Sequence, residues 1–296
     1  MFFYLRWKDR RPESIQLLNN SPKKINFSET FKVKEVEHTI CGWINPEFHT
    51  YYPPAKVTHK KSQYLSSHLQ KCIRRMNDIM SIKTAKNFID LDYTSFIRRL
   101  PIIMLEDVSL HESFPILIWL MISNTKGFKL KIPIFKWLLG IVYHLSTCRE
   151  KTYYSKIEGE IDLNNNDDLM MNTLRFRKCY GGMKGDMEMI EYYTQQLKHM
   201  TINRDKISII KHTVDGLNKG EWLFEANDFH CNHYLLDYIQ NIFPDYKKDY
   251  IKKLIWIFSS SLNFRIDPLE FNNKEMNDWS IIKRSVKKYQ KNCIYY

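Results

Sequence analysis

The chain lacks the cysteine pattern of a secreted disulfide scaffold or of a structural zinc module. Its six cysteines stand singly along 296 residues, and no two of them form a CxxC pair. Small secreted domains and zinc modules instead use closely spaced cysteines. The pattern therefore favours reduced thiols and an intracellular protein, cytoplasmic or nuclear.

Long apolar segments are also missing. The longest apolar run covers residues 114–122, well short of the roughly 20 residues that a membrane-crossing helix needs. The N-terminal stretch carries charges at Arg6, Lys8, Asp9 and the two arginines that follow, so it lacks the apolar centre of a secretory signal. We expect neither secretion nor a membrane partner.

Catalytic and nucleotide-binding signatures do not occur. The chain contains no GxxxxGK[ST], no GxGxxG after a strand, no GxSxG and no HExxH. Glycines at residues 180–186 would let backbone amides approach a phosphate, with Lys184 adding charge. Because this stretch fails the nucleotide patterns, we interpret it as a turn between helices. These absences favour a protein that is not an enzyme and needs no cofactor.

What the chain does have is a large hydrophobic fraction and an excess of positive charge. Hydrophobic residues make up 44% and aromatic residues 14%, enough to fill a core. Lys and Arg number 45 against 33 Asp and Glu, which gives a net charge of +12. Such a surface attracts phosphates or other acidic partners. The bias toward Lys, Asn, Ile and Tyr indicates an AT-rich genome, and a large DNA virus is one such source.

Hydrophobic periodicity predicts a mainly α protein, a multi-helix bundle. Between residues 62 and 80 the apolar positions recur at three- and four-residue steps, as on one face of a helix. Asp92 is placed to cap a further helix, which Pro101 would kink or divide. The nearly continuous apolarity of residues 114–122 and 132–149 predicts helices at the centre of the core.

Four regions follow from composition. Residues 1–55 lack helical periodicity and include a β-leaning stretch, so we expect an irregular N-terminal segment with short strands. Residues 56–157 form the predicted helical core, and residues 158–168 form an acidic, Asn-rich linker. Residues 169–296 form a C-terminal helical region. Helices are predicted there near residues 169–180, 186–200, 229–243, 246–262 and 279–291.

The sharpest local charge feature is an acid-free basic stretch at residues 56–77. On the predicted helix, its last three cations lie largely away from the apolar stripe, so they could face phosphates. The alternatives are a solvated helix face, or arginines that pair with acidic groups on a neighbouring helix. The nucleic-acid-binding candidates are Lys56, Lys60, Lys61, Lys71, Arg74 and Arg75.

A second charged set consists of Arg98, Arg99, Glu106 and Asp107. Arg99 and Glu106 are two turns apart, which is too far for a direct pair on a straight helix. Their partners should therefore lie on other helices. A buried Arg–carboxylate network between helices is favoured over catalysis by Glu106 or Asp107.

One cluster has the composition of a metal site: Asp228, His230, Cys231 and His233. These side chains carry the right donor atoms for zinc, but adjacent residues point in different directions and no second ligand pair appears. We interpret Asp228 as the cap of an amphipathic helix, and we expect no metal. The cluster remains the chemical centre in the alternative that the chain is an enzyme.

The order of several short motifs resembles a known helical domain. Leu69-Gln70-Lys71, Ile73-Arg74-Arg75, Ala85, Arg98-Arg99-Leu100 and Glu106-Asp107-Val108 follow one another, and residues 141–146 with Lys151 and Tyr154 come later. Over residues 62–155 this order is similar to the C-terminal domain of the RarA/MgsA-type AAA+ ATPases, relatives of the bacterial clamp loader.

The resemblance implies an all-helical module that mediates self-association. The family that the segment resembles is associated with stalled replication forks, DNA ends and single-strand-binding protein. The ATPase module of that family does not precede the helical part, so ATP hydrolysis is not implied.

The leading hypothesis is a non-enzymatic, helical, oligomerising protein that binds DNA, rather than RNA, or a replication or repair partner through residues 56–75. An enzyme of unfamiliar family is one alternative. A structural or virion protein whose charge neutralises packaged nucleic acid is another. All three account for the net charge.

Overall fold

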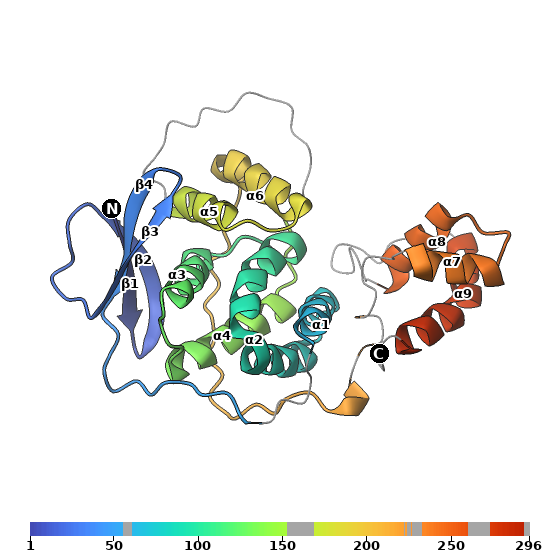
Figure 1. The fold of residues 1–296 in the computed structure, drawn as a ribbon, viewed down its shortest axis with the longest axis horizontal. Coiled ribbons are helices and arrows are strands. Elements are labelled where there is room, and N and C mark those ends of the chain that lie inside the picture. Colours follow the sequence, from blue (N-terminus) through green and yellow to red (C-terminus); the bar gives the residue numbers. More distant parts are fainter. Residues whose placement is uncertain are drawn as a thin grey trace.

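The computed structural model describes residues 1–55, 61–152, 169–221, 223, 226, 233–259 and 273–292. In this part of the chain, a small sheet at the N-terminal end is followed by a helical body and then by a group of C-terminal helices (Figure 1). The prediction of a mainly α protein with β structure near the N-terminus is confirmed.

Residues 2–42 form a regular four-stranded sheet, where the sequence predicts an irregular segment with short strands. Two hairpins meet along a parallel central pair, in the order β2-β1-β4-β3. Asp9 and Arg10 form the first hairpin turn with positive φ angles of 49° and 63°. Such turns usually contain Asn-Gly or Asp-Gly, so their usual sequence signal is absent here. The strands are β1 (Phe2–Lys8), β2 (Arg11–Leu18), β3 (Phe27–Val33) and β4 (Val36–Gly42).

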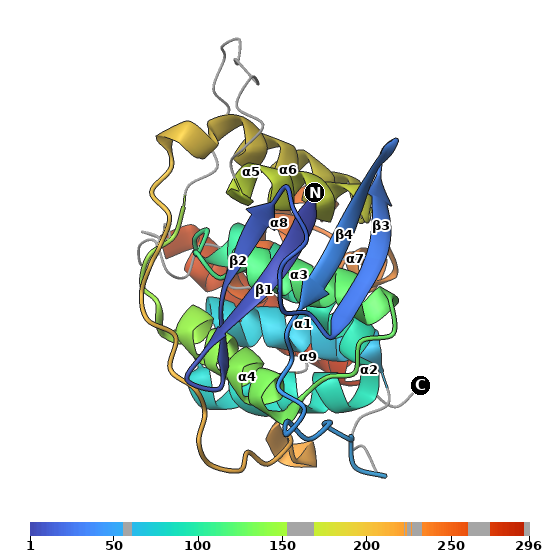
Figure 2. The ribbon, with the colours of Figure 1, turned by 90° about the vertical axis from the view of Figure 1, so that its left-hand side faces the viewer.

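One face of the sheet packs on helices α3 (Phe114–Thr125) and α5 (Leu169–Cys179), as the face-on view of the strands shows (Figure 2). The indole nitrogen of Trp119 donates to the backbone oxygens of Phe3 and Cys41, at 3.1 and 3.0 Å. Phe176 of α5 meets the ring of Phe3 edge to face, with centroids 5.5 Å apart. The sheet is therefore part of the main core.

The helical body surrounds α3, which is almost completely buried, together with much of α4 (Ile132–Thr147). Both were predicted as the centre of the core, and their burial confirms it. The remaining elements of the body are α1 (Ser62–Arg74), α2 (Asp78–Asp107), α6 (Lys184–Gln196) and the short 3-10 helices η1 (Leu197–His199) and η2 (Lys219–Glu221).

Two breaks shape α1 and α2. The helix predicted over residues 62–80 is interrupted at Met76, whose φ is 54°, and Asn77 then caps α2 by accepting from the amide of Met80 at 3.1 Å. Asp92 leaves the helical conformation and accepts from the amide of Ser95 at 2.9 Å, so it caps the second half of α2 as predicted. Helical angles continue through Pro101, so the kink lies at Asp92 instead.

The C-terminal region divides differently from the prediction. The expected linker at residues 158–168 lies outside the described residues. Helices α5 and α6 share the main hydrophobic core with the sheet, because Phe176 and Ile190 are buried in it. A second core joins α7 (His233–Ile242), α8 (Lys248–Leu254), the π-helical turn η4 (Ile255–Ser259) and α9 (Asn273–Asn292).

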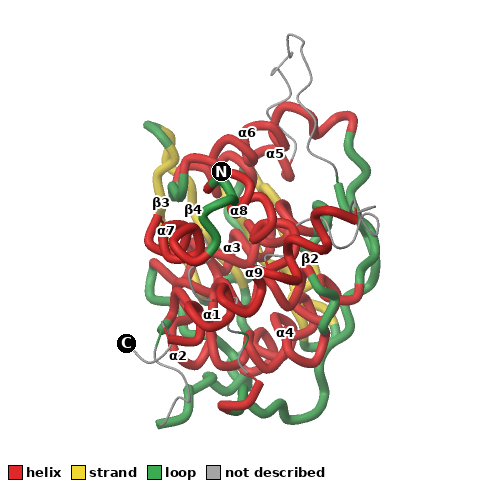
Figure 3. Tube along the Cα trace, turned by 90° about the vertical axis from the view of Figure 1, so that its right-hand side faces the viewer, coloured by secondary structure: helices red, strands yellow, loops and turns green. Residues whose placement is uncertain are grey.

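We call these last helices, residues 233–259 and 273–292, the C-terminal unit. Leu235, Ile239, Ile282 and Val286 are fully buried in its core. The unit lies at the opposite end of the molecule from the sheet (Figure 1) and faces the viewer in Figure 3. Arg75 links α1 to it by donating to the backbone oxygen of Ser259 at 2.8 Å. None of the described helices is both long and apolar enough to cross a lipid bilayer.

Candidate nucleic-acid interface

Lys71 and Arg74 of α1 do not face solvent, which corrects the expectation that they contact phosphates. The exposed fraction is 0% for Lys71 and 3% for Arg74. Lys71 donates to the hydroxyl of Ser67 at 3.3 Å. The reason is that α1 is buried on several sides, so residues away from its apolar stripe also pack against neighbours.

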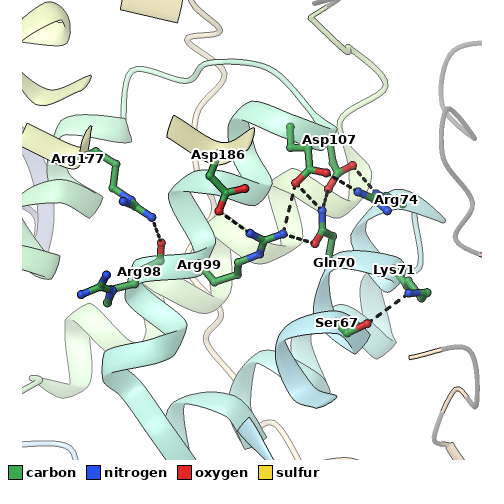
Figure 4. A network of polar contacts seen from close by, with 10 residues as sticks. Ser67, Gln70, Lys71, Arg74, Arg98, Arg99, Asp107, Arg177 and Asp186 are labelled. Atoms are coloured by element: carbon green, nitrogen blue, oxygen red, sulfur yellow. Dashed lines mark hydrogen bonds and ion pairs between the residues drawn. The ribbon is translucent and has the colours of Figure 1, made fainter. Parts of the chain in front are cut away.

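Arg74 is held by two carboxylates at the end of α2 (Figure 4). Its Nε lies 2.5 Å from Asp107 Oδ1, and its Nη2 lies 2.8 Å from Glu106 Oε1. Burial disfavours the charge on Arg74, but the two carboxylates outweigh burial and raise its pKa. Burial and the neighbouring Asp107 together raise the pKa of Glu106. This cluster joins α1 to α2, and removal of one partner would leave a buried charge unpaired.

Arg99 extends the network to α6. It lies 3.4 Å from Glu106, 3.1 Å from Asp186 and 2.6 Å from the side-chain oxygen of Gln70. The amide nitrogen of Gln70 in turn donates to Glu106 and Asp107, at 2.8 and 2.7 Å. Arg99 and Glu106 therefore do meet directly, contrary to the expectation for a straight helix, because two long side chains span two turns.

Two further arginines fasten the glycine-rich turn between α5 and α6. Arg98 donates to the backbone oxygen of Tyr180 at 3.0 Å, and Arg177 donates to that of Gly181 at 2.9 Å. Gly181 has a φ of 70°, which favours glycine. Burial, and then the charge of Arg98, lower the pKa of Arg177 to about 10. The stretch joins two helices, in line with its interpretation as a turn.

Of the other predicted phosphate contacts, only Lys61 and Arg75 lie among the described residues. Lys56 and Lys60 lie outside the described residues, and Lys61 is exposed just before α1. Arg75 is half-buried and contacts Ser259 of the C-terminal unit. The described part of the basic stretch, residues 61–77, is therefore divided between the interior and the surface.

The metal-like cluster is only partly described. Asp228, His230 and Cys231 lie outside the described residues, and His233 is exposed at the start of α7. Elsewhere in the described ranges, no three His, Cys, Asp or Glu side chains gather as they would around a metal ion.

A cavity of about 300 Å³ lies where the chain after β4 meets the break in α2. Its lining includes Tyr51 and Asp90, but these groups already bind each other through the tyrosine hydroxyl. The ammonium group of Lys86 forms an ion pair with the other carboxylate oxygen of Asp90, at 2.5 Å. Both oxygens of the Asp90 carboxylate are thus already bound by side chains of the protein.

The exposed basic face of the molecule that the sequence reasoning missed is on α9. Residues 279–296 contain no Asp or Glu. Trp279, Ile282 and Val286 point into the C-terminal core, and the cations lie on the opposite side at steps of four residues. The exposed cations of this basic face are Lys283, Arg284, Lys287, Lys288 and Lys291.

Three of the five acidic groups in the described part of the C-terminal unit form ion pairs away from this face. Asp278 binds Lys274 at 2.6 Å, Glu275 binds Lys253 at 2.5 Å, and Asp237 binds Lys248. The hydroxyls of two tyrosines also donate to Asp278. These pairs lie on α7, α8 and the first turn of α9, and the second half of α9 itself contains cations but no acidic residue.

Three cations on this half are not engaged within the described structure. Lys283, Arg284 and Lys288 make no ion pair or hydrogen bond with any residue in the described ranges. The described part of the unit holds ten Lys or Arg against five Asp or Glu. The local signal in the sequence, a run of cations without acids, was as clear here as at residues 56–77.

No known protein family, curated protein or solved structure matches the chain. The resemblance of residues 62–155 to the RarA/MgsA-type domain therefore stays a prediction.

Proposed function

We propose that this protein binds nucleic acid, without catalysing a reaction, through the basic face of α9. The observation that carries the proposal is the separation of charge within the C-terminal unit. Asp237, Glu275 and Asp278 are paired with lysines on α8 and the first turn of α9, whereas Lys283, Arg284 and Lys288 farther along α9 are exposed and have no partner among the described residues.

The spacing of these cations suits a phosphate backbone. At a rise of about 1.5 Å per residue, the run from Lys283 to Lys291 extends over about 12 Å. A duplex carries one negative charge per about 1.7 Å of its axis, so several phosphates lie within reach of such a run. Cations that neutralise phosphates release bound counterions, and this release is the main source of sequence-independent affinity.

The C-terminal unit can present this face without any rearrangement of its core. The apolar side chains of α9 are buried against α7 and α8, on the side opposite the cations. In α1, by contrast, exposure of Lys71 or Arg74 would break a buried polar network. We therefore place the interface on α9 rather than on residues 56–75.

Self-association and a replication or repair partner remain predictions from the resemblance. A structural protein that coats packaged nucleic acid would use the same phosphate contacts. Stoichiometry separates the two roles, because coating continues as protein is added whereas a discrete complex saturates.

The test is the salt dependence of binding to a labelled DNA duplex by fluorescence anisotropy. The variant is Lys283→Gln/Arg284→Gln/Lys288→Gln in the full chain. If all three contact phosphates, the slope of log affinity against log salt should fall by about 0.9 for each lost contact. Melting should be unchanged, because the three side chains are exposed.

The matched control is Lys23→Gln/Lys32→Gln/Lys206→Gln, which removes the same charge from exposed positions outside the C-terminal unit. It should keep the slope of the unmodified protein. Equal slopes for the α9 variant and the unmodified protein would contradict the proposal, as would equal losses in both variants.

A further inference from the structure

The outward face of α9 has two chemically different halves. At 100° per residue, Asn273, Asn277 and Ser280 project on the same side of the helix as Lys283 and Lys287. All five are exposed. The face is therefore neutral and polar over its first turns and cationic over its last turns.

The neutral half is not needed to neutralise phosphates. The side-chain amides of Asn273 and Asn277 make no hydrogen bond within the described structure, whereas Ser280 donates to the backbone oxygen of Asn277 at 2.7 Å. Two large apolar side chains of α9, Met276 and Ile281, are each 51% exposed. Carboxamides and apolar groups side by side are the chemistry with which proteins read base edges.

Resting on the proposed function, we propose that α9 lies in the major groove of duplex DNA and reads sequence with its N-terminal half. The carboxamides of Asn273 and Asn277 each offer one donor and one acceptor, which match the N7 and N6 positions of adenine. Met276 and Ile281 supply apolar surface for thymine methyl groups. The cations of the second half contact the flanking phosphates and fix the orientation of the helix.

The dimensions of α9 select DNA over RNA. A helix with its side chains is about 10–12 Å wide, and the major groove of B-DNA is about 12 Å wide. The major groove of A-form RNA is too deep and narrow for side chains to read. The C-terminal unit forms one end of the molecule (Figures 1 and 3), so the sheet lies far from the DNA.

The inference is tested by selection of bound sequences from a pool of duplex DNA with randomised positions, using the full chain. We expect enrichment of a short motif that contains A·T pairs. In Asn273→Ala/Asn277→Ala, preference at the pairs read by these residues should fall by about tenfold or more each. Affinity for unselected duplex should stay nearly the same, because that affinity comes from phosphate contacts.

The matched control is Asn19→Ala/Asn20→Ala, which removes two exposed carboxamides from the loop after β2 and should leave the motif intact. If the unmodified protein binds duplex DNA but enriches no motif, or if the α9 asparagine variant enriches the same motif, the inference is overturned while the proposed function stands. Equal affinity for duplex RNA of the same length would also overturn it. Absence of duplex binding, or binding that survives neutralisation of the basic face, would overturn the proposed function itself.

Discussion

Helices α1 and α9 have similar patterns in the sequence and opposite environments in the structure. Each alternates an apolar stripe with cations, and each has an acid-free run. In α1 the cations Lys71 and Arg74 are buried, and Arg74 is bound by Glu106 and Asp107 of α2. In α9 the corresponding positions point outward from a small core.

The difference comes from what packs against each helix. Glu106 and Asp107 follow Arg74 by 32 and 33 residues, and only the return of α2 alongside α1 brings them into contact. Glu275 and Asp278 of the C-terminal unit instead pair with Lys253 on α8 and Lys274 on the first turn of α9. A basic run therefore indicates a binding surface only when the neighbouring elements leave it uncovered.

The largest expected effect is a loss of stability when the buried cation of α1 is removed, because no such loss is expected for an exposed cation. Arg74→Met should lower the free energy of unfolding by about 3–5 kcal/mol, because it leaves the buried carboxylate of Asp107 without its cation. Urea unfolding measures the loss. Arg204→Met removes an exposed arginine and should change stability by less than about 0.5 kcal/mol. Equal stability of the two variants would mean that the α1 network does not support the fold.

A second prediction tests whether the two cores are separate. Ile282 is fully buried in the C-terminal core, and Ile282→Ala should cost about 2–5 kcal/mol there. Hydrogen exchange should increase in α7 and α9 and stay slow in β1 and α3, because those elements belong to the other core. A uniform increase along the whole chain would show that the C-terminal unit and the body unfold together.

Much of the helical body could be predicted from the sequence, because periodicity and capping are local. The apolar segments at residues 114–122 and 132–149 lie in buried helices, and Asp92 caps the second half of α2. The sheet was underestimated because its turns at Asp9-Arg10 and Lys34 lack glycine. Likewise, the division between the cores could not be predicted, since it depends on how Phe176 packs against distant strands.

The candidate site was harder to predict for the same reason. Exposure of a cation depends on tertiary contacts, and nothing within residues 62–75 shows that Arg74 will meet Asp107. The run of cations in α9 is equally visible in the sequence. Whether it can bind phosphates depends on whether acidic residues such as Glu275 and Asp278 pair with those cations or with other lysines. The local charge patterns mark both helices as basic, but they do not show which of the two exposes its cations.

The smallest expected effect is a dependence of stability on pH that arises in the body. His111 accepts from the amide of Ser113 at Nδ1 and donates to the backbone oxygen of Asp205 from Nε2, at 3.0 and 2.9 Å. Burial lowers the pKa of His111, although Asp205 and Glu112 oppose this shift. His144 also lies close, with ring centroids 4.8 Å apart.

The sign of this effect follows from proton linkage. With its pKa lowered in the folded state, His111 binds fewer protons when folded than when unfolded, so stability decreases as pH falls through the range below 6.5. Protonation of Nδ1 would also break the bond from Ser113. In His111→Gln this part of the slope should disappear in urea titrations at successive pH values. A slope that persists undiminished in the variant would assign the pH dependence to other groups.

The most direct test compares both helices at once by acetylation of lysines in the free protein and in its complex with duplex DNA, followed by mass spectrometry. Lys283, Lys287 and Lys288 are exposed and should react in the free protein and become protected in the complex. Lys71 is buried and should stay unreactive in both, while Lys23 and Lys32 should react in both. The account would be contradicted if the α9 lysines react as fast in the complex as in the free protein. It would also be contradicted if Lys71 reacts in the free protein and is protected by DNA.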